Sequence, residues 1–395
     1  MKTADYKETL DQYYVHVYNR FPIVLERGDG MRVYDTDGKE YLDFAAGIAV
    51  FALGYNDPEY NAALTDQIGK IIHTSNLYYN VPAAEASEKL VRSCGMSKAF
   101  FTNSGTEAIE GAIKAARKYA WKKGKKEGGI IAMKNSFHGR SVGALSVTGN
   151  DHYQEAFRPL MGGVKFARFN DFDSILECVG DDTCAIILET VQGEGGIYPA
   201  DPAFLRDVRA LCDEKDILLI LDEIQCGMGR TGDLWAFDGY GIKPDIMTCA
   251  KALGCGVPVG AFVLNEKTAS SSLEPGDHGT TYGGNPLACA AVSAVFDIFE
   301  KRDIVGHVRE LTPYFERKLG ELTDRHSCVK ERRGKGFMQG LELEGRKVGE
   351  VVAAAREKGL LVISAGTNVL RLVPPLAAQK EDFDKMAEIL DVCLG

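Results

Sequence analysis

The sequence has no apolar run of the roughly 18 residues that a membrane-spanning helix requires. Its first ten residues, MKTADYKETL, are polar and lack the apolar core of a secretory signal. None of its ten cysteines forms a CxxC pair, and no Cys/His cluster has zinc-binding spacing. These absences argue against a membrane protein, a disulfide-stabilised secreted domain and a zinc site, and they predict a soluble protein of the reducing cytoplasm.

An excess of positive charge is also absent. The chain of 395 residues carries a formal net charge of −10 at pH 7. Such acidity disfavours a general affinity for nucleic acid. The one basic run, at residues 122–126, follows a helical pattern and indicates a solvated helix end.

What the sequence does contain, from about residue 60, is an alternation of amphipathic helices with short apolar runs. Helices are expected at Glu107–Trp121 and Pro202–Glu214. Short apolar runs without alternation fit strands that are buried on both faces of a largely parallel sheet. The candidate strands are Ala99–Thr102, Ile130–Met133, Ala185–Glu189, Ile217–Leu221, Ile246–Cys249 and Ala261–Leu264. The pattern predicts an α/β layered fold.

The two ends of the chain differ from this pattern. The first forty residues look irregular apart from a hairpin formed by Met31–Tyr34 and Glu40–Phe44. After residue 300, a helix near Leu311–Leu322 precedes three strand-like segments and an amphipathic closing helix. The three segments are Gly336–Leu343, Leu360–Ser364 and Val369–Val373. We predict an N-terminal segment (1–55) that contributes to a small domain, a large domain (56–300) and a small α+β C-terminal domain (301–395).

Two of the apolar runs end in residues that can carry chemistry. Asp222 follows one run, and Lys251 follows another among small and apolar neighbours. Ligands of open α/β sheets bind at the carboxyl ends of the strands, although an acid there can also be a helix cap or a metal ligand. Burial lowers the pKa of a lysine and makes it nucleophilic. An acid and a lysine at two strand ends fit pyridoxal phosphate (PLP), because the lysine forms the Schiff base and the acid keeps the pyridine nitrogen protonated.

A phosphate site and a carboxylate site are weaker predictions. Ser104, Gly105 and Thr106 lie between a predicted strand and a predicted helix, where backbone N–H groups bind anions. The same residues also fit an ordinary helix N-cap. Further on, Phe137 could stack on a flat ring and Arg140 could bind a carboxylate through its planar guanidinium group.

Taken together, six segments resemble the class III (omega) aminotransferases, in the order of that family and across nearly the whole chain. They are Ser-Gly-Thr-Glu-Ala at 104–108, Phe-His-Gly-Arg at 137–140, Gln-Gly-Glu-Gly-Gly at 192–196, Leu-Asp-Glu-Ile-Gln at 221–225, Ala-Lys-Ala-Leu-Gly at 250–254 and His-Gly-Thr-Thr-Tyr-Gly-Gly-Asn-Pro at 278–286. The resemblance implies a PLP-dependent transferase of fold type I, with a large, mostly parallel-sheet domain and a smaller α+β domain. It also implies a homodimer with a shared active site.

The resemblance assigns a role to each matching residue. Lys251 would be the Schiff-base lysine and proton shuttle, and Asp222 would pair with the pyridine nitrogen. The remaining cofactor-binding residues would be Ser104, Gly105 and Thr106 at the phosphate, Phe137 stacked on the ring, Gln225 near the phenolic oxygen, and Thr281, which would reach the phosphate from the neighbouring subunit. Thr280 would then lie at the substrate.

Within the class, three further segments, Asn19–Val24, Phe44–Val50 and His73–Asn80, resemble the acetylornithine subgroup. Arg140 would then bind the α-carboxylate of the amine donor, and Arg371 that of glutamate or 2-oxoglutarate. Glu194 is expected to pair with Arg371 and to release it for the dicarboxylate. The implied reaction moves the terminal amine of N2-acetyl-L-ornithine to 2-oxoglutarate, in arginine biosynthesis.

Other reactions of the same fold stay open. Succinyldiaminopimelate, succinylornithine, ornithine or 4-aminobutyrate could be the amine donor, and decarboxylases and aminomutases share the fold. A regulatory PLP-binding protein would be expected to lose the lysine or the acid, and both are present.

Overall fold

The six apolar runs predicted as strands lie in one seven-stranded sheet of the computed structural model, which describes residues 3–395. The strand order is β4-β12-β11-β10-β7-β5-β6, and the edge strand β6 was not predicted. The bounds are β4 (Lys98–Thr102), β5 (Gly129–Met133), β6 (Val164–Ala167), β7 (Thr183–Glu189), β10 (Leu218–Asp222), β11 (Ile246–Ala250) and β12 (Gly260–Leu264). Strand β12 alone runs in the opposite direction to the other six, so the prediction of a largely parallel sheet is confirmed.

The central strands form because both faces of the sheet are covered. Every residue of β7, β10 and β11 is buried. Successive side chains point to opposite faces. Leu218 and Ile220 therefore join one hydrophobic cluster, which includes Ile109 and Ile113 of α5 (Gly105–Lys122). The residues between and after them join the larger cluster on the other face.

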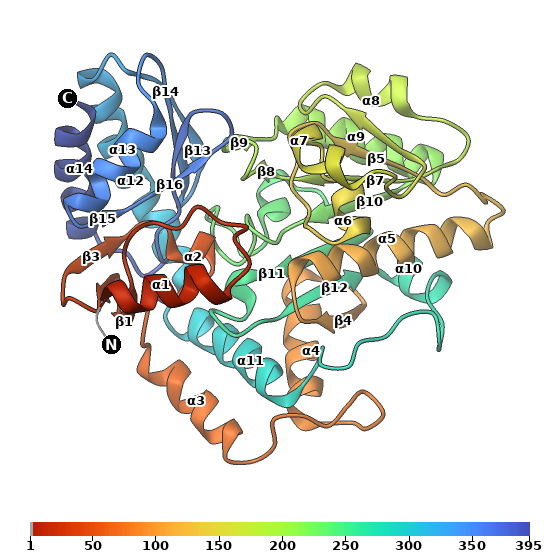
Figure 1. Cartoon of the computed structure of the whole chain (residues 1–395). Coiled ribbons are helices and arrows are strands. Elements are labelled where there is room, and N and C mark those ends of the chain that lie inside the picture. The colour runs from red at the N-terminus through yellow and green to blue at the C-terminus, as the bar shows by residue number, and fades with distance from the viewer. Residues whose placement is uncertain (1–2) are drawn as a thin grey trace.

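Helices cover both faces of this sheet (Figure 1). Helix α9 (Pro202–Lys215) starts at the predicted Pro202, where the side chain of Asp201 accepts hydrogen bonds from Ala203 N and Phe204 N. The other helices of this part of the chain are α3 (Pro58–Ile68), α4 (Val81–Cys94), α6 (Val142–Ser146), α7 (Asp151–Gln154), α8 (Phe172–Cys178), α10 (Glu266–Ser271) and α11 (Pro286–Lys301). A short hairpin of β8 (Val191–Gln192) and β9 (Tyr198–Pro199) projects from the sheet's edge.

The C-terminal elements form a second lobe beside the large sheet (Figure 1). Its antiparallel sheet has the order β13-β14-β17-β16. The elements are α12 (Ile304–Arg325), β13 (Val329–Lys335), β14 (Met338–Leu343), α13 (Val348–Glu357), β16 (Ile363–Ala365), β17 (Val369–Leu372) and α14 (Lys380–Leu394). The predicted α+β character is present, and strand β13 was missed.

The N-terminal residues are more regular than predicted. They contain α1 (Thr3–Tyr13) and a sheet in the order β1-β2-β3-β15, made of β1 (Leu25–Asp29), β2 (Arg32–Asp35), β3 (Glu40–Asp43) and β15 (Leu360–Leu361). The predicted hairpin is present as β2 and β3, but the prediction that the rest of the start is irregular was wrong. Helix α1 was missed because it buries no residue. The β3–β15 pairing joins the start of the chain to the C-terminal lobe.

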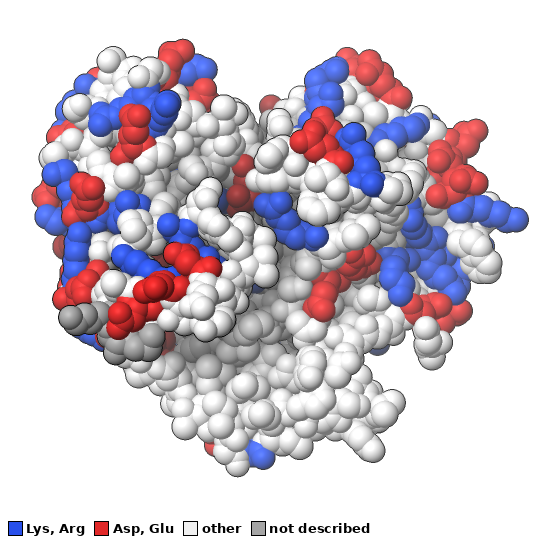
Figure 2. Space-filling view, viewed as in Figure 1, with Lys and Arg blue, Asp and Glu red and all other residues white. Residues whose placement is uncertain are grey.

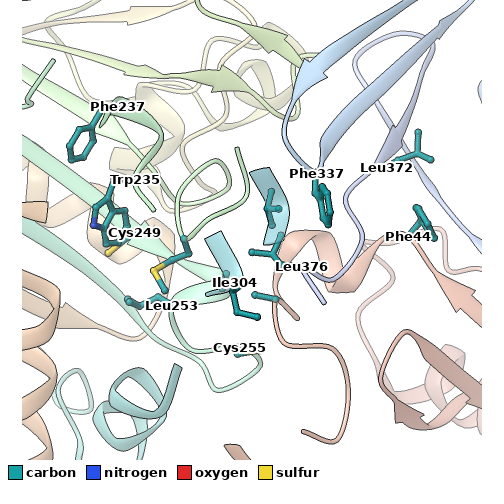
Figure 3. Packing of buried hydrophobic residues seen from close by; sticks show 14 of the residues in the cluster. Phe44, Trp235, Phe237, Cys249, Leu253, Cys255, Ile304, Phe337, Leu372 and Leu376 are labelled. Atoms are coloured by element: carbon teal, nitrogen blue, oxygen red, sulfur yellow. The ribbon is translucent and has the colours of Figure 1, made fainter. Parts of the chain in front are cut away.

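A continuous apolar core joins the lobes. Cys249 of β11 and Trp235 belong to the same cluster as Phe337 and Phe44 of the second lobe, and Figure 3 shows Ile304 and Leu376 between them. No helix in the described part of the chain is long and apolar enough to cross a membrane.

Candidate active site

The strand ends of the large sheet bring three polar residues into register. Asp222, the last residue of β10, pairs with Glu189 at the end of β7 and with Thr248 of β11. Lys251 follows β11 directly, with a φ of 50° that turns the chain away from the strand. The predicted acid and lysine therefore lie at the same carboxyl edge of the sheet.

The carboxylate of Asp222 is held on three sides. It accepts hydrogen bonds from Ile224 N at 3.0 Å and from Thr248 Oγ1 at 3.3 Å, and its Oδ2 lies 2.7 Å from Nδ1 of His138. Burial disfavours the charged imidazole, but the hydrogen bond and charge of Asp222 raise the pKa of His138 above its usual value. These contacts hold the Asp222 carboxylate in one position at the carboxyl edge of the sheet.

Lys251 has a free amine in these surroundings. No residue among 3–395 hydrogen-bonds or ion-pairs with its Nζ. Burial lowers the pKa of Lys251 to about 8, against an opposing effect of the Glu194 carboxylate. A lysine with this pKa is partly neutral, and so nucleophilic, near neutral pH.

The N-terminus of α5 offers an anion site beside these residues. Ser104 is the N-cap, and its hydroxyl accepts a hydrogen bond from Glu107 N at 3.3 Å. The cap reading is therefore correct for Ser104, but the N–H groups of Gly105 and Thr106 have no acceptor in the described chain. The helix dipole and these free donors suit a phosphate.

The glycine of the Phe-His-Gly-Arg segment allows a close approach to this helix. Gly139 has a φ of 139°, and a Cβ there would lie 2.3 Å from Thr106 Oγ1. Ser141 N donates to the same oxygen at 3.2 Å. The segment that carries Phe137 and His138 is thus packed against the helix N-terminus.

One small cavity collects these groups. Its lining is Gly105, Thr106, Phe137, His138, Gly139, Glu189, Val191, Asp222, Ile224, Gln225, Cys226 and Lys251. It therefore contains an amine, a carboxylate, an anion cradle and an aromatic face, and the buried Nε2 of His138 has no partner within the described residues. These residues fit PLP, which needs one group of each kind.

The predicted pair of Glu194 and Arg371 is present in the structure. Arg371 is 3% exposed, and its guanidinium ion-pairs with Glu194 and donates to Gln225 Oε1 at 3.1 Å. Burial raises the pKa of Glu194, but the charge of Arg371 outweighs it and holds that pKa below its usual value. Gln225 Nε2 also donates to Glu194 at 3.4 Å, so the ion pair is continuous with the Lys251 cavity.

A larger cavity of about 610 Å³ opens above this pair, between the lobes. One wall is formed by Asn150 and Tyr153 of the large lobe, the other by the turn 364–369 of the C-terminal lobe. Phe137 lines both this cavity and the Lys251 cavity, and Glu194 lines this cavity. Figure 2 shows the cleft between the two lobes from outside.

Three predicted residues lie away from the Lys251 cavity. Arg140 is exposed, with its guanidinium carbon 3.9 Å from the centre of the Tyr153 ring. Thr280 accepts hydrogen bonds from Asn103 Nδ2 at 3.3 Å and from Gly283 N at 3.1 Å. Thr281 is exposed on the same loop and does not line the Lys251 cavity.

Two residues of the site were missed from the sequence. His138 lay inside a quoted motif but received no role, and its contact with Asp222 spans 84 positions. Glu189 ended a predicted strand, and it accepts hydrogen bonds from Phe137 N and Gly193 N, both at 3.2 Å. Burial raises the pKa of Glu189 to about 7. An acid that ends a fully apolar strand was the available signal.

Comparison with known proteins gives a consistent picture. The profile of the family described as aminotransferase class-III matches residues 13–394. The acetylornithine aminotransferase of Methanocaldococcus jannaschii is 49% identical over 381 residues, covering 96% of this chain and 95% of that protein. That of Caldanaerobacter subterraneus subsp. tengcongensis is 49% identical over 385 residues, covering 97% and 98%.

Solved structures agree. The ornithine aminotransferase of Toxoplasma gondii, with partial occupancy of PLP at its active site, has a TM-score of 0.96 at 30% identity, covering 100% of this chain and 94% of that one. The N-acetylornithine aminotransferase of Stenotrophomonas maltophilia K279a has a TM-score of 0.84 at 37% identity, covering 98% and 97%.

Proposed function

Because the chain belongs to the class-III aminotransferase family and is a PLP-dependent aminotransferase, we propose that it moves the terminal amine of N2-acetyl-L-ornithine to 2-oxoglutarate. The products are N-acetyl-L-glutamate 5-semialdehyde and L-glutamate. Arginine biosynthesis uses this reaction. The proteins of M. jannaschii and C. subterraneus that resemble this chain along nearly their whole length are acetylornithine aminotransferases, which supports this choice of donor.

The observation that carries the choice of donor is the charge balance of the larger cavity. Two carboxylates line this cavity, and both form ion pairs. Glu194 pairs with Arg371, and Glu342 pairs with Arg333 at 2.6 Å. No lining residue therefore offers an unpaired acid to the α-ammonium group of free ornithine. An acylated amine carries no charge, so its burial here leaves no unpaired charge. The charges that line the cavity therefore favour N2-acetyl-L-ornithine over ornithine.

We propose these roles for the cofactor-binding residues. Gly105 and Thr106 would bind the phosphate, Phe137 would cover one face of the ring, and Asp222 would hold a proton on the pyridine nitrogen. Once bound, PLP supplies an electron sink for the charge that develops at the carbon carrying the amine.

Lys251 would then act as the base. Its Nζ, with a pKa of about 8, can accept a proton from that substrate carbon and return it in the next step. Arg140 would bind the α-carboxylate of the donor. In the second half-reaction, the α-carboxylate of 2-oxoglutarate would displace Glu194 from Arg371, because a carboxylate that replaces a carboxylate leaves the buried guanidinium paired.

The direct test is an absorbance titration of the purified holoenzyme. N2-acetyl-L-ornithine alone should bleach the visible band of the bound cofactor, and 2-oxoglutarate should restore it, with one glutamate formed per cycle. A band that ornithine, succinylornithine, succinyldiaminopimelate or 4-aminobutyrate bleaches, but N2-acetyl-L-ornithine does not, would reassign the donor. Carbon dioxide release, or amine migration without a 2-oxo acid, would point to a decarboxylase or an aminomutase.

Replacing Glu194 with alanine should separate the two half-reactions. The variant leaves Arg371 buried without its carboxylate partner, which disfavours a donor whose chain carries no charge at that point. We expect kcat/KM for N2-acetyl-L-ornithine to fall roughly 10- to 100-fold, while that for 2-oxoglutarate stays unchanged or rises. Single-turnover kinetics of each half-reaction measure both values.

A matched control is Glu321→Ala, which removes the carboxylate from an exposed ion pair with Arg317 on α12. That variant should alter neither half-reaction, because exposed pairs contribute little. An equal change in both half-reactions of Glu194→Ala would contradict the switch.

We also propose that the active unit is a homodimer with a shared site. Exposed apolar side chains gather between α3 and α4 and beside the loop that carries Thr281. They are Ile68, Ile71, Ile72, Leu77, Tyr78, Tyr79, Val81 and Tyr282. Figure 2 shows a largely uncharged surface over this region. Asn76 Nδ2 donates to Gly283 O at 2.9 Å, so the patch and the loop would dock together, and a second copy would bring Thr281 to the partner's phosphate site.

The dimer can be tested by sedimentation. The wild type should sediment as a dimer, and Leu77→Asp combined with Tyr79→Asp should give a folded monomer with weakened PLP binding. Asp substitutions at two exposed residues outside the patch, Leu176 and Val392, provide the control. A monomeric wild type with full activity would contradict the shared site.

We also propose domain boundaries and a cellular location for the chain. The pairing of β3 with β15 supports an N-terminal segment (1–55) that joins the C-terminal small domain (301–395), beside a large domain (56–300). All ten cysteines are free, and eight are buried, which supports a cytoplasmic location.

A further inference from the structure

Arg140 is held against an aromatic ring rather than by an acid. Its guanidinium carbon lies 3.9 Å from the centre of the Tyr153 ring and 5.3 Å from that of Phe137. The side chain is exposed, and its guanidinium forms no hydrogen bond or ion pair with a carboxylate or carbonyl in residues 3–395. Its N–H groups are therefore free to bind a ligand while its guanidinium carbon lies over the Tyr153 ring.

Tyr153 is itself fixed in place. It lies in α7, and the next residue, Gln154, is buried and donates through Nε2 to Leu145 O at 3.0 Å and to Thr148 O at 2.9 Å. The Tyr153 ring meets the Phe137 ring edge-on, with centroids 6.3 Å apart. The Tyr153 hydroxyl makes no hydrogen bond within the described chain, so the ring and not the phenol group supports Arg140.

The position of Tyr153 connects this stack to the substrate. Its ring lines the larger cavity together with Phe137, which also borders the Lys251 cavity. An exposed arginine without a partner samples many rotamers, and binding a carboxylate would have to order it. A guanidinium that already rests flat on a ring keeps its N–H edge directed outward and loses less freedom when it binds.

We propose that Tyr153 is a positioning residue that presents Arg140 to the carboxylate of the amine donor. It thereby makes the site selective for donors that carry a carboxylate at the end remote from the reacting amine. The inference rests on the proposed function, because it takes Arg140 as the donor's carboxylate site. Tyr153 acts through Arg140, and no hydrogen bond or ring contact joins it to Lys251 or Arg371 among the described residues.

Two donors that differ only in the carboxylate test the inference. N-acetylputrescine has the terminal amine and the acetamide of N2-acetyl-L-ornithine but lacks its carboxylate. In Tyr153→Leu holoenzyme, the ratio of kcat/KM for the carboxylated donor to that for N-acetylputrescine should fall about three- to tenfold through a higher KM for the carboxylated donor. The kcat for each donor at saturation should stay at its wild-type value. Tyr153→Phe, which keeps the ring, should retain the wild-type ratio.

The chain offers a matched control in Tyr34, whose ring lies 3.6 Å below the guanidinium carbon of Arg27 on the N-terminal sheet. Tyr34→Leu removes an equivalent stack and should leave the ratio unchanged. An unchanged ratio in Tyr153→Leu, or an equal loss with both donors, would overturn the inference. Failure of the wild type to use N2-acetyl-L-ornithine would instead overturn the proposed donor, and the ratio would then be measured with ornithine against putrescine.

Discussion

Replacing Lys251 with alanine should lower the transamination rate at least about 10,000-fold, because one side chain is both the attachment point and the base. The amine is suited to both roles because burial lowers its pKa to about 8. It also has no hydrogen-bond or ion-pair partner in the described residues. The substitution should leave the fold intact, since alanine buries no charge and tolerates the φ of 50° about as well as lysine does. Turnover with N2-acetyl-L-ornithine and 2-oxoglutarate measures the loss, and thermal unfolding measures the stability.

Two comparisons make this result specific. In Lys251→Ala the cofactor should dialyse away under conditions in which the wild type retains it. Lys98→Ala, at an exposed position at the start of β4, should change neither activity nor cofactor retention. A Lys251→Ala rate within tenfold of the wild type would remove the lysine from the mechanism.

The second large effect is expected for Asp222→Asn, with kcat lowered roughly 1,000-fold. The amide keeps the shape of the carboxylate but loses the charge that would hold a proton on the pyridine nitrogen. It also removes the charge that raises the pKa of His138, so that this pKa falls. Kinetics of the reconstituted variant, at saturating concentrations of both substrates, measure kcat without a contribution from substrate binding.

Asp245→Asn is the matched control, because Asp245 is also a buried acid of the same sheet. It precedes β11 at the opposite edge and pairs with Arg209 at 2.9 Å. Breaking that pair should lower the melting temperature while kcat stays near the wild-type value. If both variants lost activity equally, the role of Asp222 would be structural.

The second lobe shows where sequence patterns end. Strand β17 was predicted from its apolar residues. Strand β14 was also predicted, but from Gly336, two residues before it begins. Strand β13, with the sequence VKERRGK, has no strand-like pattern of its own. It forms because β14 supplies its hydrogen-bonding partner, and that pairing is a property of the folded sheet.

The candidate site divides in the same way. Lys251 and Asp222 could be identified from the sequence because each follows an apolar run. An apolar run of that kind predicts a buried strand. His138 could not be given its role, because its partner Asp222 is 84 positions away. The pair of Glu194 and Arg371, 177 positions apart, was inferred from family resemblance and not from any local pattern.

The sequence by itself thus determined the α/β class, the central strands and the acid and lysine at their ends, because these depend on hydrophobic periodicity over five to ten residues. The tertiary structure alone decided that Glu189 lies in register with Asp222, and that the guanidinium of Arg140 lies over the ring of Tyr153. The reason is physical. Strand register and the docking of lobes follow from the packing of side chains far apart in the chain, and no short segment contains that information.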